Sequence, residues 1–301
     1  MADMLEAPSE GAWGVRLENG YFAVIQKAGF RSVRIPVAFQ IHALGNPPYT
    51  IDTNFFGRVD GAVKSALDCG LAVVIDLHHY GELRKEPEKH RARFLSIWDR
   101  IARHYQNYPD TVYFELFNEP GEGLSPVVWN ALVAQTLRVV RQSNPKRAVI
   151  IDAPEWANID GLEKLRLPEN DRNLIVTCHY YNPFEFTHQG AVWIGPRADA
   201  WLGTRWPSGQ VQLTAIQRDF DKIQAWSKLN KRPIYLGEFG AYSKADMKSR
   251  ASWTAYVARQ CEERGFSWAY WEFCSGFGAY DPPARVWREP LLKALVAPPQ
   301  Q

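Results

Sequence analysis

The stretch LAVVIDLHHYGELRKEPEKHRARFLSIWDRIARHYQNYPDTVYFELFNEP, residues 71–120, decides the fold. It begins with an apolar run rich in Val and Ile (71–80), continues with a segment of helical period (89–105), and ends with a second apolar run (112–120). Continuous apolar runs are typical of strands that are buried on both faces of a parallel sheet. The stretch therefore predicts a strand, a helix and a second, parallel strand.

The same alternation continues on both sides of this stretch. Apolar runs that predict buried strands span 32–39, 71–80, 112–120, 148–156, 174–181, 233–242 and 267–275. Segments of helical period lie between them, including 55–70, 89–105, 127–143, 216–230 and 249–265. Strands and helices alternate in the order of an α/β (β/α)8 barrel. We therefore predict such a barrel as a single domain over residues 1–301.

One of the eight strands is missing from this pattern. A barrel needs a strand before the helix predicted at about 19–29, yet the preceding MADMLEAPSEGAWG contains no strand-like run. Either residues 1–5 supply a stub, or the chain is truncated and lacks most or all of its first strand. The gap would expose two sheet edges, and exposed edges invite pairing with another chain. A homodimer through these edges is therefore a hypothesis.

Composition excludes several classes of function. The net charge is +2, with 35 basic and 33 acidic residues spread along the chain, so we expect no nucleic-acid partner. The chain lacks an apolar run long enough to cross a membrane, and its amino terminus lacks the basic start and apolar run of a signal peptide. We expect a soluble chain. Because no HxH, HExxH or CxxC spacing occurs, we expect neither a metal nor a cofactor.

Two glutamates end separate strand runs, Glu119 in VYFELFNEP and Glu238 in PIYLGEFGAY. Catalytic groups of a barrel gather at the carboxyl ends of its strands, so both side chains can act on one bond. Retaining glycosidases use two carboxyl groups about 5 Å apart, one as nucleophile and one as acid and base. Asn118 is suited to hydrogen-bonding the sugar 2-hydroxyl. The pair predicts glycoside hydrolysis.

Further polar residues follow the same strand ends. Alternation along LIVTCHYY places His179 and Tyr181 on one face, where Tyr181 can donate to the nucleophile and His179 can tune the acid. Arg34 can keep Glu238 ionised or can pair with Glu115.

Histidines and tryptophans complete the predicted site. At least one of His78 and His79 should face it, since adjacent strand residues point to opposite faces. Trp271 is a candidate platform for a pyranose ring. The long aromatic segment 182–206 should form part of the cleft wall, with His188 and Trp193 as contacts.

The motifs NEP (118–120), GEFG (237–240), RIP (34–36), DLHHY (76–80) and HYYNPFEFTHQGA (179–191) resemble those of family-5 glycoside hydrolases. The likeness is strongest to thermophilic bacterial endo-β-1,4-glucanases that also cut mannan, and it covers nearly the whole chain. It implies a (β/α)8 barrel and retaining endo-hydrolysis of β-1,4-glycans.

The resemblance also implies roles for individual residues. Glu119 matches the acid and base, and Glu238 matches the nucleophile. The residues that match the surrounding site of the family are Arg34, His78, His79, Asn118, His179, Tyr181 and Trp271. Those that match its outer sugar contacts are Glu6, His188 and Trp193. The departure lies at the start, where relatives carry a strand reading like GINLGN and Asp3 stands in place of an expected Asn.

We therefore predict a retaining endo-β-1,4-glucanase that binds a β-1,4-linked polysaccharide or oligosaccharide. Two alternatives stay open. An endo-β-mannanase or mixed-linkage glucanase can use the same catalytic pair, because loops set the choice of substrate. A carbohydrate-binding variant with impaired catalysis would bind cello-oligosaccharides without cutting them.

Overall fold

A computed structural model describes residues 1–207 and 209–296. Contacts within the chain divide it into two compact units. The amino-terminal unit contains Met1 and Asp3–Thr177, and the carboxyl-terminal unit contains Ala2 and the chain from Cys178 onward. Among the described residues, seven strands follow one another in one sheet in the order β1 to β7. This strand order with intervening helices is that of a (β/α)8 barrel without its first strand, as predicted.

The strands of the amino-terminal unit pair in parallel in the order in which they occur in the chain. They are β1 (Ser32–Val37), β2 (Ala72–Leu77), β3 (Val112–Glu115), β4 (Val149–Asp152) and the first part of β5 (Leu174–Tyr180). The register places Asp76 opposite Glu115 and Asp152 opposite Thr177. Acidic residues therefore lie at or next to the carboxyl ends of three neighbouring strands, since Glu115 and Asp152 end β3 and β4 and Asp76 is the last residue but one of β2.

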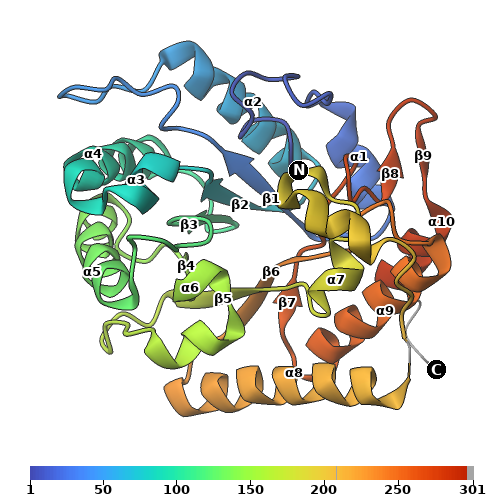
Figure 1. Ribbon diagram of the computed structural model, residues 1–301. Coiled ribbons are helices and arrows are strands. Elements are labelled where there is room, and N and C mark those ends of the chain that lie inside the picture. Colours follow the sequence, from blue (N-terminus) through green and yellow to red (C-terminus); the bar gives the residue numbers. More distant parts are fainter. Residues whose placement is uncertain (208, 297–301) are drawn as a thin grey trace. The chain divides into compact units, whose positions relative to one another are not determined.

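Helices follow an arc around the outside of these strands, from α1 through α2 and α4 to α5 (Figure 1). They are α1 (Gly20–Lys27), α2 (Thr53–Asp68), α3 (Gly81–Lys85), α4 (Pro87–His104), α5 (Pro126–Ser143), α6 (Pro154–Ala157) and the 3-10 turn η1 (Ile159–Lys164). Two buried tryptophans fasten helices to the chain near the strand ends. Trp98 of α4 donates to the Leu116 carbonyl at 2.9 Å, and Trp129 of α5 donates to the Asp152 carbonyl at 2.9 Å.

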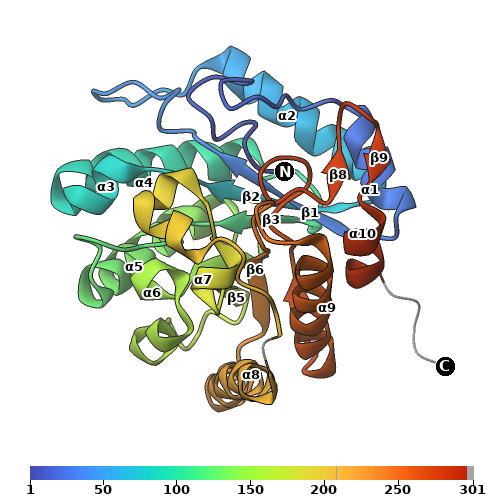
Figure 2. The same ribbon diagram turned by 45° about the vertical axis from the view of Figure 1, so that its right-hand side comes forward.

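The carboxyl-terminal unit contains the end of β5, β6 (Ile234–Phe239) and β7 (Ser267–Trp268), the last two paired in parallel. Its helices and turns are α7 (Phe184–Thr187), η2 (Val192–Ile194), η3 (Pro196–Trp201), α8 (Gln210–Asn230), α9 (Met247–Glu263) and α10 (Glu289–Leu295). Helices α9 and α10 pack against each other (Figure 2). A short antiparallel hairpin, β8 (Tyr280–Asp281) with β9 (Val286–Trp287), precedes α10.

The amino-terminal segment takes no strand conformation, and no strand precedes β1 among the described residues. It nevertheless lies along β1. The Met1 ammonium group donates to the Arg34 carbonyl at 2.9 Å, and the Ala38 amide donates to the Leu5 carbonyl at 3.1 Å. Met4 and Leu5 are buried. Residues 1–5 thus act as the predicted stub, with two main-chain hydrogen bonds to β1 and its flank.

The predicted strands are too long at their carboxyl ends. The run 112–120 contains the four-residue strand β3, and the run 267–275 contains the two-residue strand β7. Glu119 therefore lies in a loop beyond β3, and Trp271 lies beyond β7. Apolar residues continue past the end of each strand because the loops that follow β3 and β7 are themselves buried. Arg34 is the third residue of β1, so it does not end its strand.

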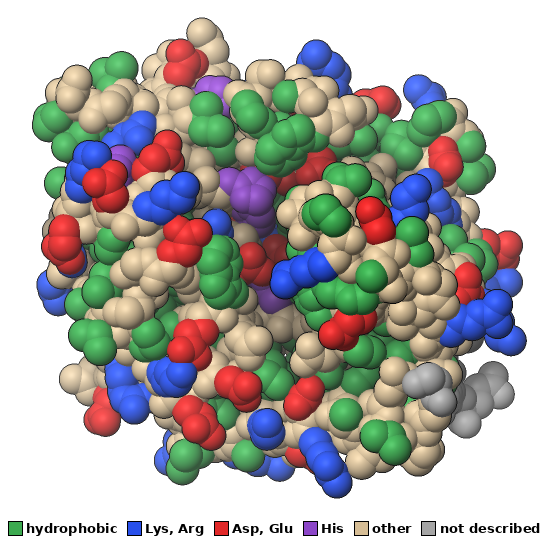
Figure 3. All heavy atoms as spheres, in the orientation of Figure 1, with side chains coloured by type: hydrophobic (Ala, Val, Ile, Leu, Met, Phe, Trp, Pro, Cys, Tyr) green, Lys and Arg blue, Asp and Glu red, His purple; other side chains and the backbone are tan. Residues whose placement is uncertain are grey.

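Surface charge is mixed. Acidic and basic side chains are interspersed over the face that Figure 3 shows. None of the described helices combines the length and apolar character that a membrane crossing requires.

Candidate active site

Glu119 lies in a tight turn that follows β3. The Asn118 amide still donates to the Leu77 carbonyl at 3.0 Å, but Glu119 has a left-handed backbone with φ 54°. Its amide donates to Oδ1 of Asp152 at 3.0 Å, and its carbonyl accepts from Nε of Arg84 at 3.0 Å. Burial raises the pKa of Glu119, while Arg84 and then Arg34 act against that rise. A carboxyl group that keeps its proton is suited to general acid catalysis.

Arg34 organises the buried side of this turn. Its guanidinium donates to both carboxylate oxygens of Glu115, at 2.7 and 2.6 Å, and to Oδ1 of Asn118 at 2.9 Å. It also lies 3.0 Å from Asp76. The bond to Oδ1 orients the Asn118 amide, so that its NH₂ donor points away from Arg34. Of the two partners predicted for Arg34, the structure shows Glu115. The influence on Glu238 stays a prediction.

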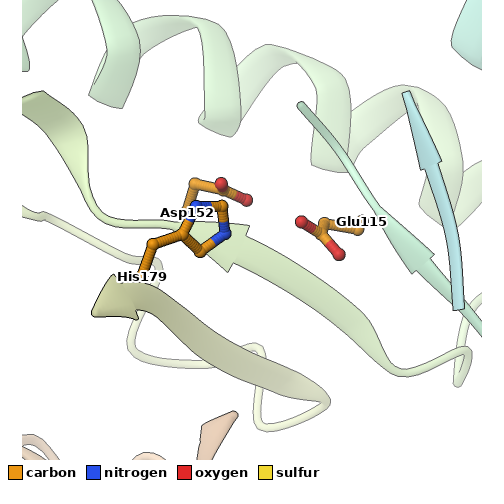
Figure 4. A group of neighbouring side chains, drawn as sticks. All are labelled: Glu115, Asp152 and His179. Atoms are coloured by element: carbon orange, nitrogen blue, oxygen red, sulfur yellow. The ribbon is translucent and has the colours of Figure 1, made fainter. Parts of the chain in front are cut away.

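Buried carboxyl groups lie behind Glu119. Glu115 and Asp152 end the neighbouring strands β3 and β4 (Figure 4). Burial first, and then the charges of Glu115 and Asp76, raise the pKa of Asp152 well above its usual value. Burial also raises the pKa of Asp76 to about 7. Carboxylates of this kind can hold a hard cation, but both oxygens of Glu115 already accept hydrogen bonds from Arg34.

The two histidines after β2 have different environments. His78 is buried, with Nδ1 2.5 Å from Oδ2 of Asp76. His79 is exposed, has φ 60°, and packs edge-on against His78. The ring of Trp13, which is 43% exposed, lies edge-on to His79 at 5.6 Å. His79 and Trp13 therefore present their rings to solvent beside the strand end, while the buried His78 packs against His79.

Glu238 lies within β6 of the carboxyl-terminal unit and is buried. Its Oε2 accepts a hydrogen bond from the Tyr181 hydroxyl at 2.8 Å and lies 3.6 Å from Nδ1 of His179. His179 lies near the end of β5 and Tyr181 directly follows that strand, and both point to Glu238, as the alternation along the run predicted. These contacts fix the direction of the Glu238 carboxylate.

Aromatic side chains follow β5 in the same unit. His188 is buried, stacks on Phe184 at 4.0 Å, and has Nδ1 2.9 Å from the Thr187 hydroxyl. Burial lowers the pKa of His188 to about 4, so the imidazole is neutral near pH 7. Trp193 is 57% exposed and lies edge-on to Tyr242 at 5.0 Å. An exposed indole that packs against another aromatic ring is suited to stacking on a sugar.

The last glycine of GEFG lies against the chain beyond β7. A Cβ at Gly240 would come within 1.9 Å of the Trp271 carbonyl, so only glycine fits there. The Trp271 amide donates to the Phe239 carbonyl at 2.8 Å, and its side chain is half-buried. Gly240 therefore permits the approach that places Trp271 beside the end of β6.

Glu6 is the most buried of the predicted outer contacts. Its carboxylate accepts hydrogen bonds from the amides of Asp3 and Met4. Burial raises the pKa of Glu6 to about 8, although hydrogen bonds from the backbone of Glu6 itself and of Asp3 partly oppose the rise. The side chain thus supports the amino-terminal stub. A sugar contact of Glu6 stays a prediction.

The sequence did not reveal Arg84, Asp152 and Trp13 as parts of the site. Arg84 lies on the short helix α3 rather than at a strand end, and it contacts backbone carbonyls, which carry no sequence signal. Asp152 had a detectable signal, because it is an acidic residue within the apolar run 148–156, and in the structure it ends β4. Trp13 lies between Gly11 and Gly14, both with positive φ, in a loop without periodicity.

Comparison with known proteins agrees with this fold. The model of the family described as Cellulase (glycosyl hydrolase family 5) matches residues 4–276. Endoglucanase H of Acetivibrio thermocellus is 32% identical over 99% of this chain, and cellulase/esterase CelE of the same organism is 28% identical over 94%. These alignments cover 32% and 35% of the relatives, so the chain spans about a third of their length.

Two solved structures of one protein are similar over nearly their full length. Cel5A of Thermotoga maritima in complex with cellobiose is 50% identical, with 98% of this chain and 96% of that chain covered and a TM-score of 0.96. The same protein in complex with mannotriose is 49% identical over the same shares, also with a TM-score of 0.96. The chain therefore belongs to the cellulase family, glycosyl hydrolase family 5.

Proposed function

We propose that this protein is a retaining endo-β-1,4-glucanase that cuts internal bonds of cellulose-type glucans. Glu119 is the acid and base, and Glu238 is the nucleophile. The observation that carries this assignment is the contrast between the two carboxyl groups. Burial raises the pKa of Glu119, which favours its protonated form, whereas Glu238 accepts a hydrogen bond from Tyr181 that orients its carboxylate.

The reaction proceeds in two displacements. Glu238 attacks the anomeric carbon while Glu119 gives its proton to the departing glycosidic oxygen, which leaves a glycosyl ester on Glu238. Glu119, now a carboxylate, then takes a proton from water as that water attacks the anomeric carbon and releases Glu238. The mechanism requires the two carboxyl groups to lie about 5 Å apart. We therefore propose that both units act as one catalytic domain over residues 1–301.

Other residues bind the substrate in this proposal. Asn118, oriented by Arg34, donates to the sugar 2-hydroxyl, a contact that strengthens in the transition state. Trp271 and Trp193 stack on sugar rings, and His188 contributes as a neutral imidazole. The remaining contacts are those of His78, His79, His179, Tyr181 and Glu6.

Rescue of activity by azide distinguishes the nucleophile from the acid and base. Glu238→Ala should abolish hydrolysis of carboxymethyl-cellulose, and on an activated aryl cellobioside added azide should restore turnover with an α-glycosyl azide as product. Glu119→Ala with azide should give the β-glycosyl azide, because the covalent intermediate still forms. Glu163→Gln changes an exposed glutamate and is the control. Wild-type turnover in Glu119→Gln or Glu238→Ala contradicts the assignment. Cello-oligosaccharide binding without hydrolysis by the wild-type protein favours the impaired carbohydrate-binding variant.

Substrate choice has a second candidate. An endo-β-mannanase or mixed-linkage glucanase on the same carboxyl pair is supported by the similar Cel5A, whose structures include both a cellobiose and a mannotriose complex. Reducing-sugar release from carboxymethyl-cellulose, glucomannan, lichenan and xylan under one set of conditions decides between these substrates. Faster cutting of glucomannan than of carboxymethyl-cellulose would favour the mannanase.

Association of two chains through the sheet edges also stays a proposal. Residues 1–5 make main-chain hydrogen bonds at Arg34 and Ala38, which leaves less of β1 for a second copy. Light scattering measures the mass in solution, and a stable monomer contradicts the dimer.

A further inference from the structure

The backbone of Glu119 adopts a conformation that its residue type disfavours. A φ of 54° is left-handed, and for a residue with a Cβ such a conformation persists where the surroundings impose it. Neither neighbour in the chain, Asn118 or Pro120, has a positive φ. The turn is therefore imposed at Glu119 itself, on the residue that carries the proposed acid and base.

Two side chains from different elements hold both backbone polar groups of Glu119. Oδ1 of Asp152, at the end of β4, accepts from the Glu119 amide at 3.0 Å. Nε of Arg84, on α3, donates to the Glu119 carbonyl at 3.0 Å, and its Nη2 donates to the Asn118 carbonyl at 2.8 Å. The Glu119 peptide groups are thus held from both sides, by a hydrogen-bond acceptor on Asp152 and a donor on Arg84.

Arg84 is itself rigidly seated. Its guanidinium carbon lies 5.3 Å from the ring centre of Phe117 and 5.0 Å from that of Trp156, an arrangement that adds cation–π attraction. Its backbone carbonyl accepts from the Gly123 amide at 2.9 Å, and a Cβ at Gly123 would come within 2.7 Å of that oxygen. Arg84 therefore holds the loop 118–123 by both its side chain and its backbone.

Asp152 is equally constrained. It is fully buried, its carbonyl accepts from the Trp129 indole at 2.9 Å, and the next amide, of Ala153, donates to the Thr177 carbonyl at 2.9 Å. The backbone of Asp152 is thus held in place on the sheet. This fixes the starting point of the side chain that accepts the hydrogen bond from the Glu119 amide.

We propose that Arg84 and Asp152 are positioning residues that clamp the Glu119 backbone and so aim its carboxyl group at the leaving-group oxygen. This inference rests on the proposed acid and base role of Glu119. Loss of either half of the clamp lets the turn relax toward an ordinary φ, which moves the carboxyl group. A displacement of about 1 Å can cost roughly a hundredfold in rate.

Leaving-group dependence tests this role, because a mere loss of folded protein lowers all rates equally. The substrates are aryl β-cellobiosides whose phenols range from 2,4-dinitrophenol, which departs without a proton, to weakly acidic phenols, which need one. For Arg84→Met we expect kcat/KM to fall by about tenfold or more on the substrate with the least acidic phenol. On the dinitrophenyl substrate it should fall by less than about threefold. Both losses lie within the rate factor that general acid catalysis contributes.

Arg93→Met is the matched control. Arg93 also donates to backbone carbonyls, those of Gln40, Ala43 and Leu44, and its guanidinium carbon lies 5.5 Å from the Tyr80 ring centre. Its loss should lower kcat/KM by the same factor for all leaving groups. A profile for Arg84→Met that is as flat as that of Arg93→Met overturns the proposal.

Asp152 is tested by a conservative and a truncating variant. Asp152→Asn keeps an oxygen acceptor for the Glu119 amide and should retain the wild-type leaving-group profile, whereas Asp152→Ala should steepen it. Equal profiles for the two variants contradict the clamp. If Arg84→Met does not fold, as judged by circular dichroism, Arg84→Lys takes its place. It keeps the charge but not the forked donors, so an unchanged profile for Arg84→Lys overturns the proposal.

Failure of the clamp can be told apart from failure of the proposed function. Glu119→Ala should show the steepest leaving-group profile and yield the β-glycosyl azide. If it shows neither, the acid and base assignment is wrong. If it shows both while Arg84→Met and Asp152→Ala keep wild-type profiles, only the clamp is wrong.

Discussion

The surroundings of Glu119 in the amino-terminal unit and of Glu238 in the carboxyl-terminal unit differ in which atoms hold the residue. Glu238 is part of the regular strand β6, and a side-chain hydrogen bond from Tyr181 orients its carboxylate. Glu119 lies outside any strand, with a left-handed backbone that Arg84 and Asp152 hold. Substitutions near Glu238 should therefore change chemistry with little loss of stability. Substitutions near Glu119 should change both.

The largest effect is expected from the buried charges behind Glu119. Arg34→Ala leaves the carboxyl groups of Glu115 and Asp76, both fully buried, without their guanidinium partner. Breaking a buried pair by removing one partner costs about 3–5 kcal/mol of unfolding free energy. Urea unfolding followed by tryptophan fluorescence measures this loss. Arg34→Lys, which keeps one charge, should lose less, and a loss below about 1 kcal/mol for Arg34→Ala contradicts the prediction.

The next effect concerns Glu238. Tyr181→Phe removes the hydroxyl that donates to Oε2 while keeping the ring. A hydrogen bond to a charged group contributes about 2 kcal/mol, which corresponds to roughly a thirtyfold loss in kcat. Steady-state kinetics on cellotetraose measure it. Tyr256→Phe, which removes a hydroxyl bound to the Leu213 carbonyl in the same unit, is the control. If Tyr181→Phe lost much stability and kept its kcat, substitutions near Glu238 would act on stability rather than on chemistry, which contradicts the contrast drawn between the two glutamates.

A smaller effect should appear in the pH profile. Arg84 is the foremost of the charges that lower the pKa of Glu119, so Arg84→Met should raise that pKa further. Because Glu119 must be protonated in its proposed role as the acid, activity should be lost as the pH rises through its pKa. The alkaline limb of kcat/KM should therefore move to higher pH in Arg84→Met and stay in place in Arg93→Met. A shift to lower pH would show that Arg84 does not act on Glu119 through its charge.

The smallest effect is expected at the surface of the amino-terminal unit. Lys64 and Asp68 form an ion pair on α2 at 2.6 Å, with both side chains largely exposed. Exposed pairs of this spacing contribute about 0.3–0.5 kcal/mol. Asp68→Asn should change the unfolding free energy by no more than this, measured as for Arg34→Ala. A larger change would mean that charge removal alone, rather than burial, explains the loss at Arg34.

Much of the fold follows from local sequence patterns. Helices predicted over 89–105 and 127–143 are the helices α4 and α5, within two residues at each end. The strand starts were placed well, because a buried strand is a continuous apolar run. The strand ends were not, because loop residues such as Leu116 and Phe117 are as apolar and as buried as the strand before them.

The sequence by itself determined the alternation of strands and helices, the lack of a strand-like run in residues 1–14, and two glutamates near the carboxyl ends of β3 and β6. These features depend on residues that are neighbours in the chain. Only the tertiary structure decided that Arg34 pairs with Glu115 and that Arg84 and Asp152 hold the Glu119 backbone. The physical reason is that these bonds join residues 33 to 81 positions apart, and two of them end on backbone atoms that every residue possesses.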